Sequence, residues 1–410
     1  MKKVLVIGYV WPEPNSSAAG RHMLSTLRLF RKQGWQIEFA TPAQPTEHMI
    51  DLNGEGITSR GIVLNCESFD AYVSEYQPDM VLFDRFMMEE QFGWRVDKNC
   101  PNAVKILDTV DLQCLRQARH EAVKANRKMT KSDLLGDLAK REIAAILRCD
   151  LSLIISSYEM ELLTNTFKVD ASLLHHLPFR IDLETSPDKT RPYSERQHFM
   201  SIGNFRHAPN WDAVLQLQKI WPLIRKKLPD TELHIYGAYP PPKATALNNP
   251  KTGFLVKGWA EEALAVMEKS RICLAPLRFG AGLKGKLLDA MIAQTPSITT
   301  PIGSEGMHDA ESWPGVIEAD WQAFADAAVS LYSDEQAWQG AQQNGNKLLK
   351  SRYDEKVQNK KLLEKITNTI ENLEQHRLNN FMGNMLKHHT MMSTKYMSQW
   401  IAAKNRESAQ

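Results

Sequence analysis

A strand, a glycine-rich loop and a helix succeed one another between residues 272 and 307, and this segment restricts the fold more than any other part of the chain. The apolar runs 272–275 and 297–300 predict buried strands, and residues 287–293 between them predict a short helix. Glycines fill the loop after each strand: Gly280, Gly282 and Gly285 in the first, Gly303 and Gly306 in the second. A strand–loop–helix–strand unit of this length is typical of a parallel α/β sheet.

The loop before this helix also carries charge. Lys284 and Lys286 flank its last glycine, and Asp289 lies about one turn inside the helix. Backbone N–H groups at a glycine-rich helix N-terminus favour a bound phosphate, and two lysines suit a diphosphate. A carboxylate one turn further along can accept hydrogen bonds from the vicinal hydroxyls of a sugar. The segment therefore predicts a site for a sugar-bearing diphosphate, and the alternative is a plain turn with a solvated rim.

Strand and helix patterns alternate through two successive halves of the chain. Continuous apolar strands separated by helices indicate parallel sheets covered on both faces. Strands are predicted at 3–10, 36–40, 80–83, 104–107, 151–156 and 172–175 in the first half, and at 199–203, 232–236, 254–256, 272–275, 297–300 and 316–317 in the second. Residues 179–198 are polar and aperiodic and predict a linker. We therefore expect two doubly wound domains, residues 1–178 and 199–353, with a ligand in the cleft between them.

Beyond residue 334 only helical patterns remain, and residues 354–410 predict a helical tail. Its apolar stripe needs a partner surface and consists of Leu362, Leu363, Ile366, Ile370 and Leu373. The last stretch, residues 377–406, combines several methionines and Trp400 with lysines. Such a helix either packs back onto its own protein or rests on a membrane surface. We expect the tail to pack back across the domain junction, with membrane contact as the secondary interpretation.

Composition excludes several classes of protein. The net charge of +2 gives no overall attraction for nucleic acid, and no apolar run reaches the roughly 20 residues of a membrane-spanning helix. The five cysteines have no CxxC spacing, which favours reduced thiols in a cytoplasmic protein with neither a disulfide framework nor a zinc site. Apolar residues near the N-terminus lead directly into the segment WPEP, so we interpret them as a first strand and not as a signal peptide.

The second half carries a set of motifs in a recognisable order. They are SIGNFRHAPNWDAV (201–214), LHIYGA (233–238), VKGW (256–259), LAPLRFGAGLKGKLLDAM (274–291) and TTPIGSEGM (299–307). They resemble the donor-binding half of GT-B glycosyltransferases, above all family 4 of the retaining nucleotide-sugar glycosyltransferases (glycosyl transferases group 1). The resemblance covers essentially all of residues 199–350, and residues 8–42 resemble the family's N-terminal glycine loop. It implies an α/β fold of two Rossmann-like domains facing a cleft.

The resemblance also implies roles for individual residues of the second half. Arg206 matches the family's basic donor-phosphate residue, Lys286 matches its phosphate lysine, and Asp289 matches the second acidic residue of a pair, which resembles a ribose ligand. The first acidic position of that pair is Ala281 here. The full set of implied donor-binding residues is Gly203, Asn204, Gly282, Lys284, Gly285, Asp289, Gly303 and Glu305.

In the first half, the resemblance places Ala19, Gly20 and Arg21 across the cleft, near the diphosphate and the acceptor. Asp108 and Asp111 stand where relatives place polar residues of the catalytic cleft, and Asp111 joins Arg206 and Lys286 as a catalytic candidate. Asp84 ends another predicted strand and either faces the acceptor or belongs to a solvated loop. Val110 occupies the position of a histidine in those relatives, which weakens a general-base role for this loop.

Taken together, these features predict transfer of a sugar from a nucleotide-diphosphate donor to an acceptor hydroxyl, with retained configuration and without a metal, since no suitable DxD motif is present. The expected acceptor is a glycan, a lipid-linked or a protein acceptor, in cell-envelope polysaccharide or glycoconjugate synthesis. The basic segment 116–131 is either a solvated helix or a contact to anionic lipid on the inner membrane face. Two alternatives stay open: a nucleotide-sugar 2-epimerase of the same fold, and a non-catalytic nucleotide-sugar binding protein.

Overall fold

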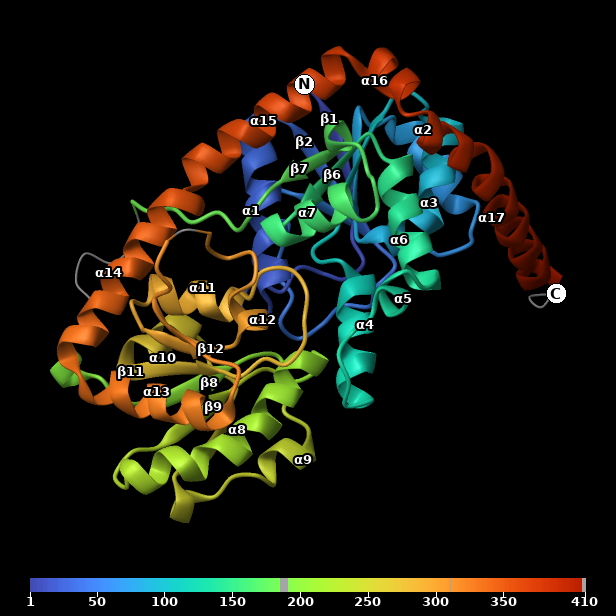
Figure 1. The fold of residues 1–410 in the computed structure, drawn as a ribbon. Coiled ribbons are helices and arrows are strands. Elements are labelled where there is room, and N and C mark those ends of the chain that lie inside the picture. The colour runs from blue at the N-terminus through green and yellow to red at the C-terminus, as the bar shows by residue number, and fades with distance from the viewer. Residues whose placement is uncertain (185–190, 310, 408–410) are drawn as a thin grey trace.

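The computed structural model describes residues 1–184, 191–309 and 311–407. Two parallel α/β units lie one above the other, and the C-terminal helices run up one side of both, over the top and down the other side of the upper unit (Figure 1). This arrangement confirms the expected fold class of two doubly wound domains with a C-terminal helical region. The centre of the predicted linker, residues 185–190, and the end of the tail, residues 408–410, lie outside the described residues.

The first unit is built on a sheet whose order over residues 1–184 is β3-β2-β1-β4-β5-β6-β7, with all neighbours parallel. The strands are β1 (Lys3–Ile7), β2 (Gln36–Thr41), β3 (Thr58–Gly61), β4 (Met80–Asp84), β5 (Val104–Asp108), β6 (Leu151–Ile154) and β7 (Leu174–His176). The helices are α1 (Ala18–Lys32), α2 (Ser68–Tyr76), α3 (Phe86–Asn99), α4 (Gln113–Lys124), α5 (Lys131–Leu134), α6 (Asp137–Arg148), α7 (Ser157–Asn165) and the 3-10 helix η1 (Ala171–Leu173). The sequence did not predict β3, because its residues TSRG are polar and largely exposed at the sheet edge.

The second unit repeats this plan with a parallel sheet of order β10-β9-β8-β11-β12-β13 among its described residues. The strands are β8 (Gln197–Ile202), β9 (Leu233–Tyr236), β10 (Phe254–Gly258), β11 (Ser270–Ala275), β12 (Ser297–Thr299) and β13 (Gly315–Ile317). The helices are η2 (Tyr193–Glu195), α8 (Ala208–Lys227), α9 (Pro242–Thr245), η3 (Pro250–Thr252), α10 (Ala263–Lys269), α11 (Gly285–Ile292), α12 (Pro301–Ser304) and α13 (Trp321–Ser333). Strand β8 begins inside the predicted linker, because Gln197 still pairs with Ser270 of β11.

Each sheet is covered on both faces, as the continuous apolar strands predicted. In β1, Leu5 and Ile7 enter one core cluster, while Val4 and Val6 enter another on the opposite face. All four side chains are fully buried. Because neither face is solvated, polar side chains of the central strands gather at the strand ends, and the carboxyl ends of both sheets become the place for a site.

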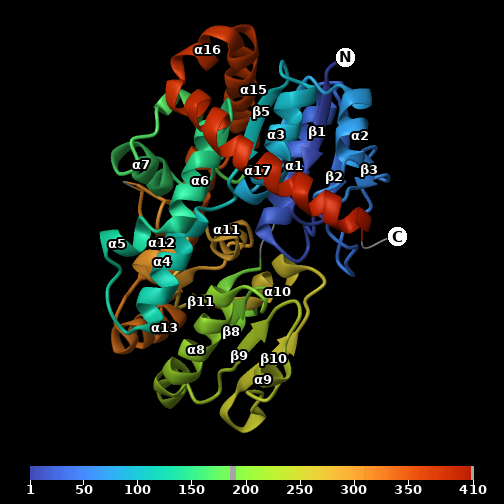
Figure 2. The ribbon, with the colours of Figure 1, turned by 90° about the vertical axis from the view of Figure 1, so that its right-hand side faces the viewer.

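The C-terminal helices connect the two units. They are α14 (Glu335–Arg352), α15 (Glu355–Glu371), α16 (Leu373–Asn379) and α17 (Phe381–Glu407). Helix α14 packs on the second unit, whereas Leu362 and Ile366 of α15 are buried in the core of the first. The crossing lies beside the linker, since Ile181 N–H donates to the Tyr353 carbonyl at 2.8 Å and Glu355 N–H donates to the Ile181 carbonyl at 3.0 Å. Helix α17 then packs along α6 and α3 of the first unit (Figure 2).

Within the described residues, no helix has both the length and the apolar character needed to cross a membrane.

Candidate functional site

The carboxyl ends of both sheets open into one cleft with a cavity volume of about 1060 Å³. One wall comes from the segments after β1, β4 and β5 of the first unit, and the other from those after β8, β9 and β11 of the second. This is the position where open α/β sheets bind ligands, outside the strand ends. A cleft of this volume and with walls from two domains suits a ligand of nucleotide-sugar size.

The glycine- and lysine-rich loop between β11 and α11 lies on the wall of the cleft, as predicted. Lys284 is buried, and its Nζ donates to the Gly282 carbonyl at 2.6 Å, so burial lowers the pKa of this amine. Lys286, in the first turn of α11, is half-buried, and burial lowers its pKa to about 8. Both amines are therefore incompletely solvated. An anion bound in the cleft would interact with them more strongly than with amines in water.

Two glycines of this loop allow the two domains to pack closely against each other. A Cβ on Gly285 would lie 2.3 Å from the Cβ of Ala18, and a Cβ on Gly282 would lie 2.9 Å from the Cβ of Asp111. Gly282 also has a φ of +62°, which disfavours any residue with a side chain. The sequence analysis assigned these glycines to phosphate binding alone, and the structure adds that they let the second unit touch the first.

Asp289, the predicted ribose ligand, lines the cleft but forms an ion pair across it. Arg21 donates to both of its carboxylate oxygens, at 2.5 and 2.8 Å. Asp289 is nearly buried and Arg21 is about one-third exposed, with side-chain exposures of 8% and 37%. The structure thus brings together two predicted residues that are 268 positions apart in sequence.

Gly303 and Glu305 lie behind the cleft wall and do not line the cavity. Glu305 accepts two hydrogen bonds from Arg119, at 2.7 and 2.8 Å, and Arg119 also donates to the Gly280 carbonyl at 2.9 Å. Thr300 caps helix α12, since its hydroxyl accepts the Gly303 N–H at 3.1 Å. These contacts give Glu305 a role in joining the domains, and they show that Arg119 of the basic segment points inward.

Sequence reasoning missed Glu159, which holds both domains at once. This residue of α7 is fully buried, and one of its carboxylate oxygens accepts N–H bonds from Leu112 at 3.0 Å and from Gly282 at 2.7 Å. Burial, followed by the charge of Asp111, raises the pKa of Glu159. Nothing in the local sequence SYEMELL marks this role, since its two partners lie 47 and 123 residues away.

The loop after β8 supplies the other basic residue of the second unit. Gly203, Asn204 and Arg206 all line the cleft, and the Arg206 guanidinium lies 3.5 Å from the centre of the Tyr239 ring. Asn204 reaches across to the first unit, where its amide donates to the Ser16 hydroxyl at 3.1 Å. Arg206 is exposed at the rim, so a phosphate in the cleft can replace water around it.

Opposite lies the N-terminal end of α1. Ser17 caps the helix by accepting the Gly20 N–H at 3.0 Å, and Ala19, Gly20 and Arg21 line the cleft as predicted. Gly20 is required by close packing, because a Cβ there would lie 2.5 Å from the backbone of Glu13. The arrangement turns the positive end of the α1 dipole and the Arg21 guanidinium toward the cavity.

Acidic residues end the central strands of the first unit. Asp84 and Asp108 are register partners on β4 and β5 and both are buried. Burial and the neighbouring Asp84 raise the pKa of Asp108 to about 7, and His22 Nε2 lies 3.7 Å from its carboxylate. Asp84 lines the cleft, whereas Asp108 lies beneath it.

Asp111, the catalytic candidate of the first unit, also lines the cleft. One of its carboxylate oxygens pairs with Arg116, and the other is buried without a hydrogen-bond partner among the described residues. The preceding residue, Val110, has a φ of +63°, which is unfavourable for a β-branched side chain. Such strain at a ligand cleft is typical of a loop that is held for function.

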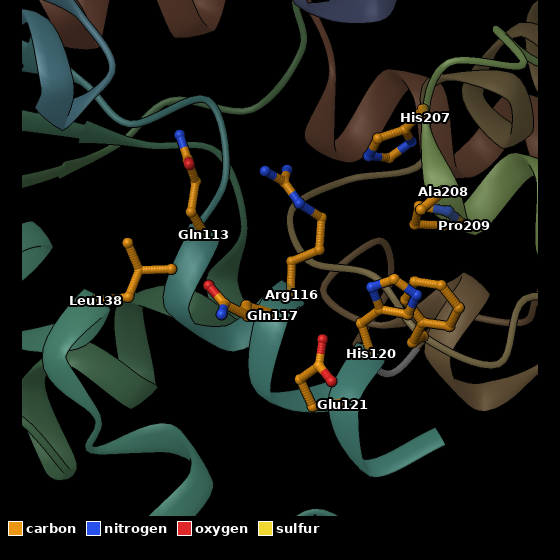
Figure 3. A pocket seen from close by; sticks show the side chains of 10 residues that line it. Gln113, Arg116, Gln117, His120, Glu121, Leu138, His207, Ala208 and Pro209 are labelled. Atoms are coloured by element: carbon orange, nitrogen blue, oxygen red, sulfur yellow. The ribbon is translucent and has the colours of Figure 1, made fainter. Parts of the chain in front are cut away.

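A smaller recess of about 320 Å³ adjoins the cleft on the side of α4 (Figure 3). Gln113, Arg116 and His120 of α4 form one side, and His207 at the start of α8 faces them. The His120 ring stacks on Phe279 with ring centres 4.4 Å apart. The recess shares Arg116 and His207 with the main cleft, so the two form one continuous polar surface.

Among the residues that the structure describes, one cluster has ligand atoms close enough for a metal ion, namely His198, Glu232 and His234. It lies at the amino ends of β8 and β9, on the far side of the sheet from the cleft. The His198 Nδ1 accepts the Glu232 N–H at 3.2 Å, so this ring nitrogen is already engaged. The cluster is therefore separate from the candidate site.

Comparison with known proteins extends these observations. The family model described as Glycosyl transferases group 1 matches residues 196–334. Sucrose-phosphate synthase from Thermosynechococcus elongatus is 14% identical with a TM-score of 0.68, covering 90% of this chain and 100% of that one. HepE from Anabaena, solved with UDP and glucose, is 11% identical with a TM-score of 0.66, covering 90% and 100%.

A TarM variant from S. aureus, solved with fondaparinux, alpha-GlcNAc-glycerol and UDP, is 14% identical with a TM-score of 0.57. The alignment covers 72% of this chain and 57% of the TarM chain, so the chain spans little more than half the length of that protein. The search of curated proteins gives no match. At these identities the structural similarities establish the fold.

Proposed function

We propose that this chain, which has the GT-B fold and whose residues 196–334 match the glycosyl transferases group 1 family, moves a sugar from a nucleotide-diphosphate donor to an acceptor hydroxyl with retained configuration. The observation that carries the proposal is the concentration of cations on one cleft. Lys284 and Lys286 lie on one wall with Arg206, and Arg21 faces them from the other. A diphosphate is the ligand that such a cleft neutralises best.

The donor diphosphate would lie at the N-terminus of α11, where backbone N–H groups and Lys286 are available. In the reaction the bond between the sugar's anomeric carbon and the diphosphate oxygen breaks, and negative charge grows on the leaving phosphate. The acceptor oxygen bonds to the anomeric carbon on the same face, and its proton passes to the departing phosphate oxygen. Lys286 and Arg206 stabilise that charge, which is the main source of rate for a reaction of this kind. UDP is present in the TarM and HepE structures named above, which supports a nucleotide diphosphate as the donor fragment.

The acceptor would enter from the side of the first unit. Asp111 lines the cleft with one carboxylate oxygen that lacks a partner among the described residues, so we assign it to holding the acceptor hydroxyl. The adjoining recess with Arg116 and His207 offers polar contacts for the rest of the acceptor. We propose a glycan, a lipid-linked or a protein acceptor, in cell-envelope polysaccharide or glycoconjugate synthesis.

A panel of nucleotide sugars, each incubated with and without a mixture of glycan acceptors, tests the proposal through release of free nucleotide diphosphate. We expect release with one donor class, acceleration by one acceptor, and no loss of activity in EDTA, because the proposed chemistry uses Lys286 and Arg206 for charge neutralisation. Lys286→Ala should abolish most of the release, and Lys347→Ala on the exposed surface of α14 is the matched control.

Each other outcome identifies a different protein. Conversion of the donor to its 2-epimer without an acceptor would indicate an epimerase of the same fold. Binding of UDP by calorimetry without release from any donor would indicate a nucleotide-sugar binding protein. Inhibition by EDTA that Mg²⁺ restores would contradict metal-free transfer but leave the transferase assignment intact.

A further inference from the structure

Helix α17 carries its large apolar side chains on the outside of the molecule. We call the following residues the outer face of α17: Phe381, Met382, Met385, Tyr396, Met397 and Trp400. Their exposed fractions are 72%, 51%, 37%, 58%, 59% and 60%. With 3.6 residues per turn, all six fall within about half of the helix circumference. A helix on the surface of a protein normally has the opposite orientation, with its apolar side inward.

Small and polar residues hold this helix on the protein. A Cβ on Gly383 would lie 2.1 Å from the Leu147 carbonyl oxygen, so the helix approaches α6 as closely as a glycine allows. Ser398 is 3% exposed, and its hydroxyl lies 3.2 Å from the Asn65 side-chain oxygen. These contacts fix the rotation of α17 and keep its outer face away from the core.

Further apolar side chains are exposed on the loop that contacts α17. Asn65, the partner of Ser398, follows Val63 and Leu64, whose exposed fractions are 60% and 42%. In Figures 1 and 2 the helix runs along the outside of the first unit, and no other drawn element lies over it. An apolar strip of this extent on a soluble domain marks a contact with something else.

The basic side chains of α17 indicate what kind of surface its outer face contacts. Lys395 and Lys404 lie beside the outer face, whereas Lys387 is half-buried and Arg406 pairs with Glu67 at 2.8 Å. The amine of Lys395 lies 6.0 Å from the Tyr396 ring, and that of Lys404 lies 5.3 Å from the Trp400 ring. Aromatic rings with lysines beside them are the side chains that settle at the boundary between lipid headgroups and acyl chains.

We propose that the outer face of α17 docks on an anionic lipid bilayer, with its aromatic and methionine side chains among the headgroups and Lys395 and Lys404 against the lipid phosphates. A second copy of the chain fits less well, because two such faces in contact would bring like charges together. The surface belongs to the first unit and lies outside the residues that line the cleft.

Flotation of the purified full-length protein with vesicles tests this docking. The vesicles are either pure phosphatidylcholine or phosphatidylcholine with about a third phosphatidylglycerol, at low and at 0.5 M salt. We expect binding to the anionic vesicles, weakened by salt, and at least about tenfold less binding by the triple variant Tyr396→Ser, Met397→Ser, Trp400→Ser. Lys395→Gln with Lys404→Gln should reduce the binding and its dependence on salt together.

A matched control replaces exposed apolar residues elsewhere, Leu223→Ser on α8 and Val357→Ser on α15, whose exposed fractions are 36% and 47%. This variant should float as the wild type does. Equal loss in the control and triple variants, equal binding to both vesicle types, or no binding by the wild type would overturn the proposal. A dimer in light scattering that the triple variant converts to a monomer, without vesicle binding, would assign the face to a second copy instead. All variants should keep the wild-type melting temperature, since the replaced side chains are exposed.

Discussion

The central strands that lead into the two walls of the cleft are followed by side chains of opposite charge. In the second unit the strand ends lead to cations and glycines, with Lys284, Lys286 and Arg206 facing the cavity. In the first unit the central strands β4 and β5 end in the buried carboxylates Asp84 and Asp108. The first set is built for an anion that arrives from outside, whereas the second set is already enclosed by the protein.

This difference in charge explains how the two domains are held together by ion pairs. Each wall lends the other a charge of opposite sign, through Arg21 with Asp289 and through Arg119 with Glu305. A bound diphosphate would compete with Asp289 for the Arg21 guanidinium. Under the proposed function, the pairing of Arg21 with Asp289 across the cleft would therefore belong to the donor site as well as bridge the domains.

We expect the largest effect from removal of the tail, because it should lower the melting temperature of the first unit and not that of the second. Truncation after Tyr353 removes Leu362 and Ile366 from the core of the first unit. Loss of two buried aliphatic side chains should cost roughly 4–10 kcal/mol. We expect a lower melting temperature for the first unit and binding of the dye ANS, followed in calorimetry by a separate transition of the second unit. Truncation after Asn380, which removes only α17, is the control, and equal destabilisation by both truncations would contradict the assignment to α15.

Lys286→Ala tests the cationic wall. The lysine should neutralise charge that grows on the leaving phosphate, so its loss should cost about 2–4 kcal/mol in the transition state, or roughly 30- to 1000-fold in kcat/KM. Steady-state kinetics with the donor found in the panel provides the measurement. An unchanged kcat/KM would remove Lys286 from the site, and an equal loss in Lys347→Ala would point to a general defect.

Asp289→Ala distinguishes a ribose ligand from a partner of Arg21. If the carboxylate holds ribose hydroxyls, UDP should bind more weakly by about 1.5–3 kcal/mol. Inorganic diphosphate should bind as before or more tightly, because Arg21 is released from its pair. Calorimetry with both ligands decides the matter, and equal losses for the two would argue against a ribose role.

Asp108→Asn tests the enclosed acidic wall through the pH dependence of stability. Burial raises the pKa of Asp108 to about 7, above the unfolded value of 3.8. The proton that the folded carboxyl retains stabilises the protein fully below pH 3.8, and this contribution is lost as pH rises through 7. Relative to wild type, the Asn variant should therefore gain on the order of 4 kcal/mol in free energy of unfolding between pH 4 and 8, measured by urea denaturation. A constant difference across that range would show that Asp108 does not titrate there.

The smallest effect is expected for the pH dependence of UDP binding. Burial lowers the pKa of Lys286 to about 8 in the empty cleft, and a bound diphosphate should raise it again. Affinity should then be level below pH 7 and fall by at most about tenfold per pH unit above 8. In Lys286→Arg the fall should be shallower, because a guanidinium stays charged. A wild-type affinity that does not change up to pH 9.5 would exclude Lys286 from the phosphate site.

The sequence predicted the cationic wall well because its elements are local. The strands, the glycine loop and the lysines of residues 272–307 lie close together in the chain, and the structure keeps them in that order. On the acidic wall the sequence marked Asp84 and Asp108 one by one, each at the end of a predicted strand, but it did not reveal their contacts. Asp84 and Asp108 come from different strands, and Glu159 meets Gly282 across 123 positions of sequence.

The same limit explains why the sequence did not reveal the contacts of site residues that it did identify. The sequence marked Gly285 and Asp289 as parts of a ligand site, but their partners in the first unit, Ala18 and Arg21, lie more than 260 residues away along the chain. Contacts of that range depend on how two finished domains dock. No periodicity or motif in a single sequence encodes that docking.

The two places where the chain passes between the units have a mechanical consequence. Both passages lie side by side, with Ile181 bridged to Asp354 in parallel strand geometry. Two covalent connections at one point act together like the pin of a hinge, so the units are free to rotate about that point but not to slide past each other. Opening the cleft would have to release the charge pairs on the far side and also the buried apolar cluster that joins Ile155 of the first unit with Leu283 and Leu287 of the second. Under the proposed function, entry of the donor and exit of the product would both use rotation about this one point of the molecule.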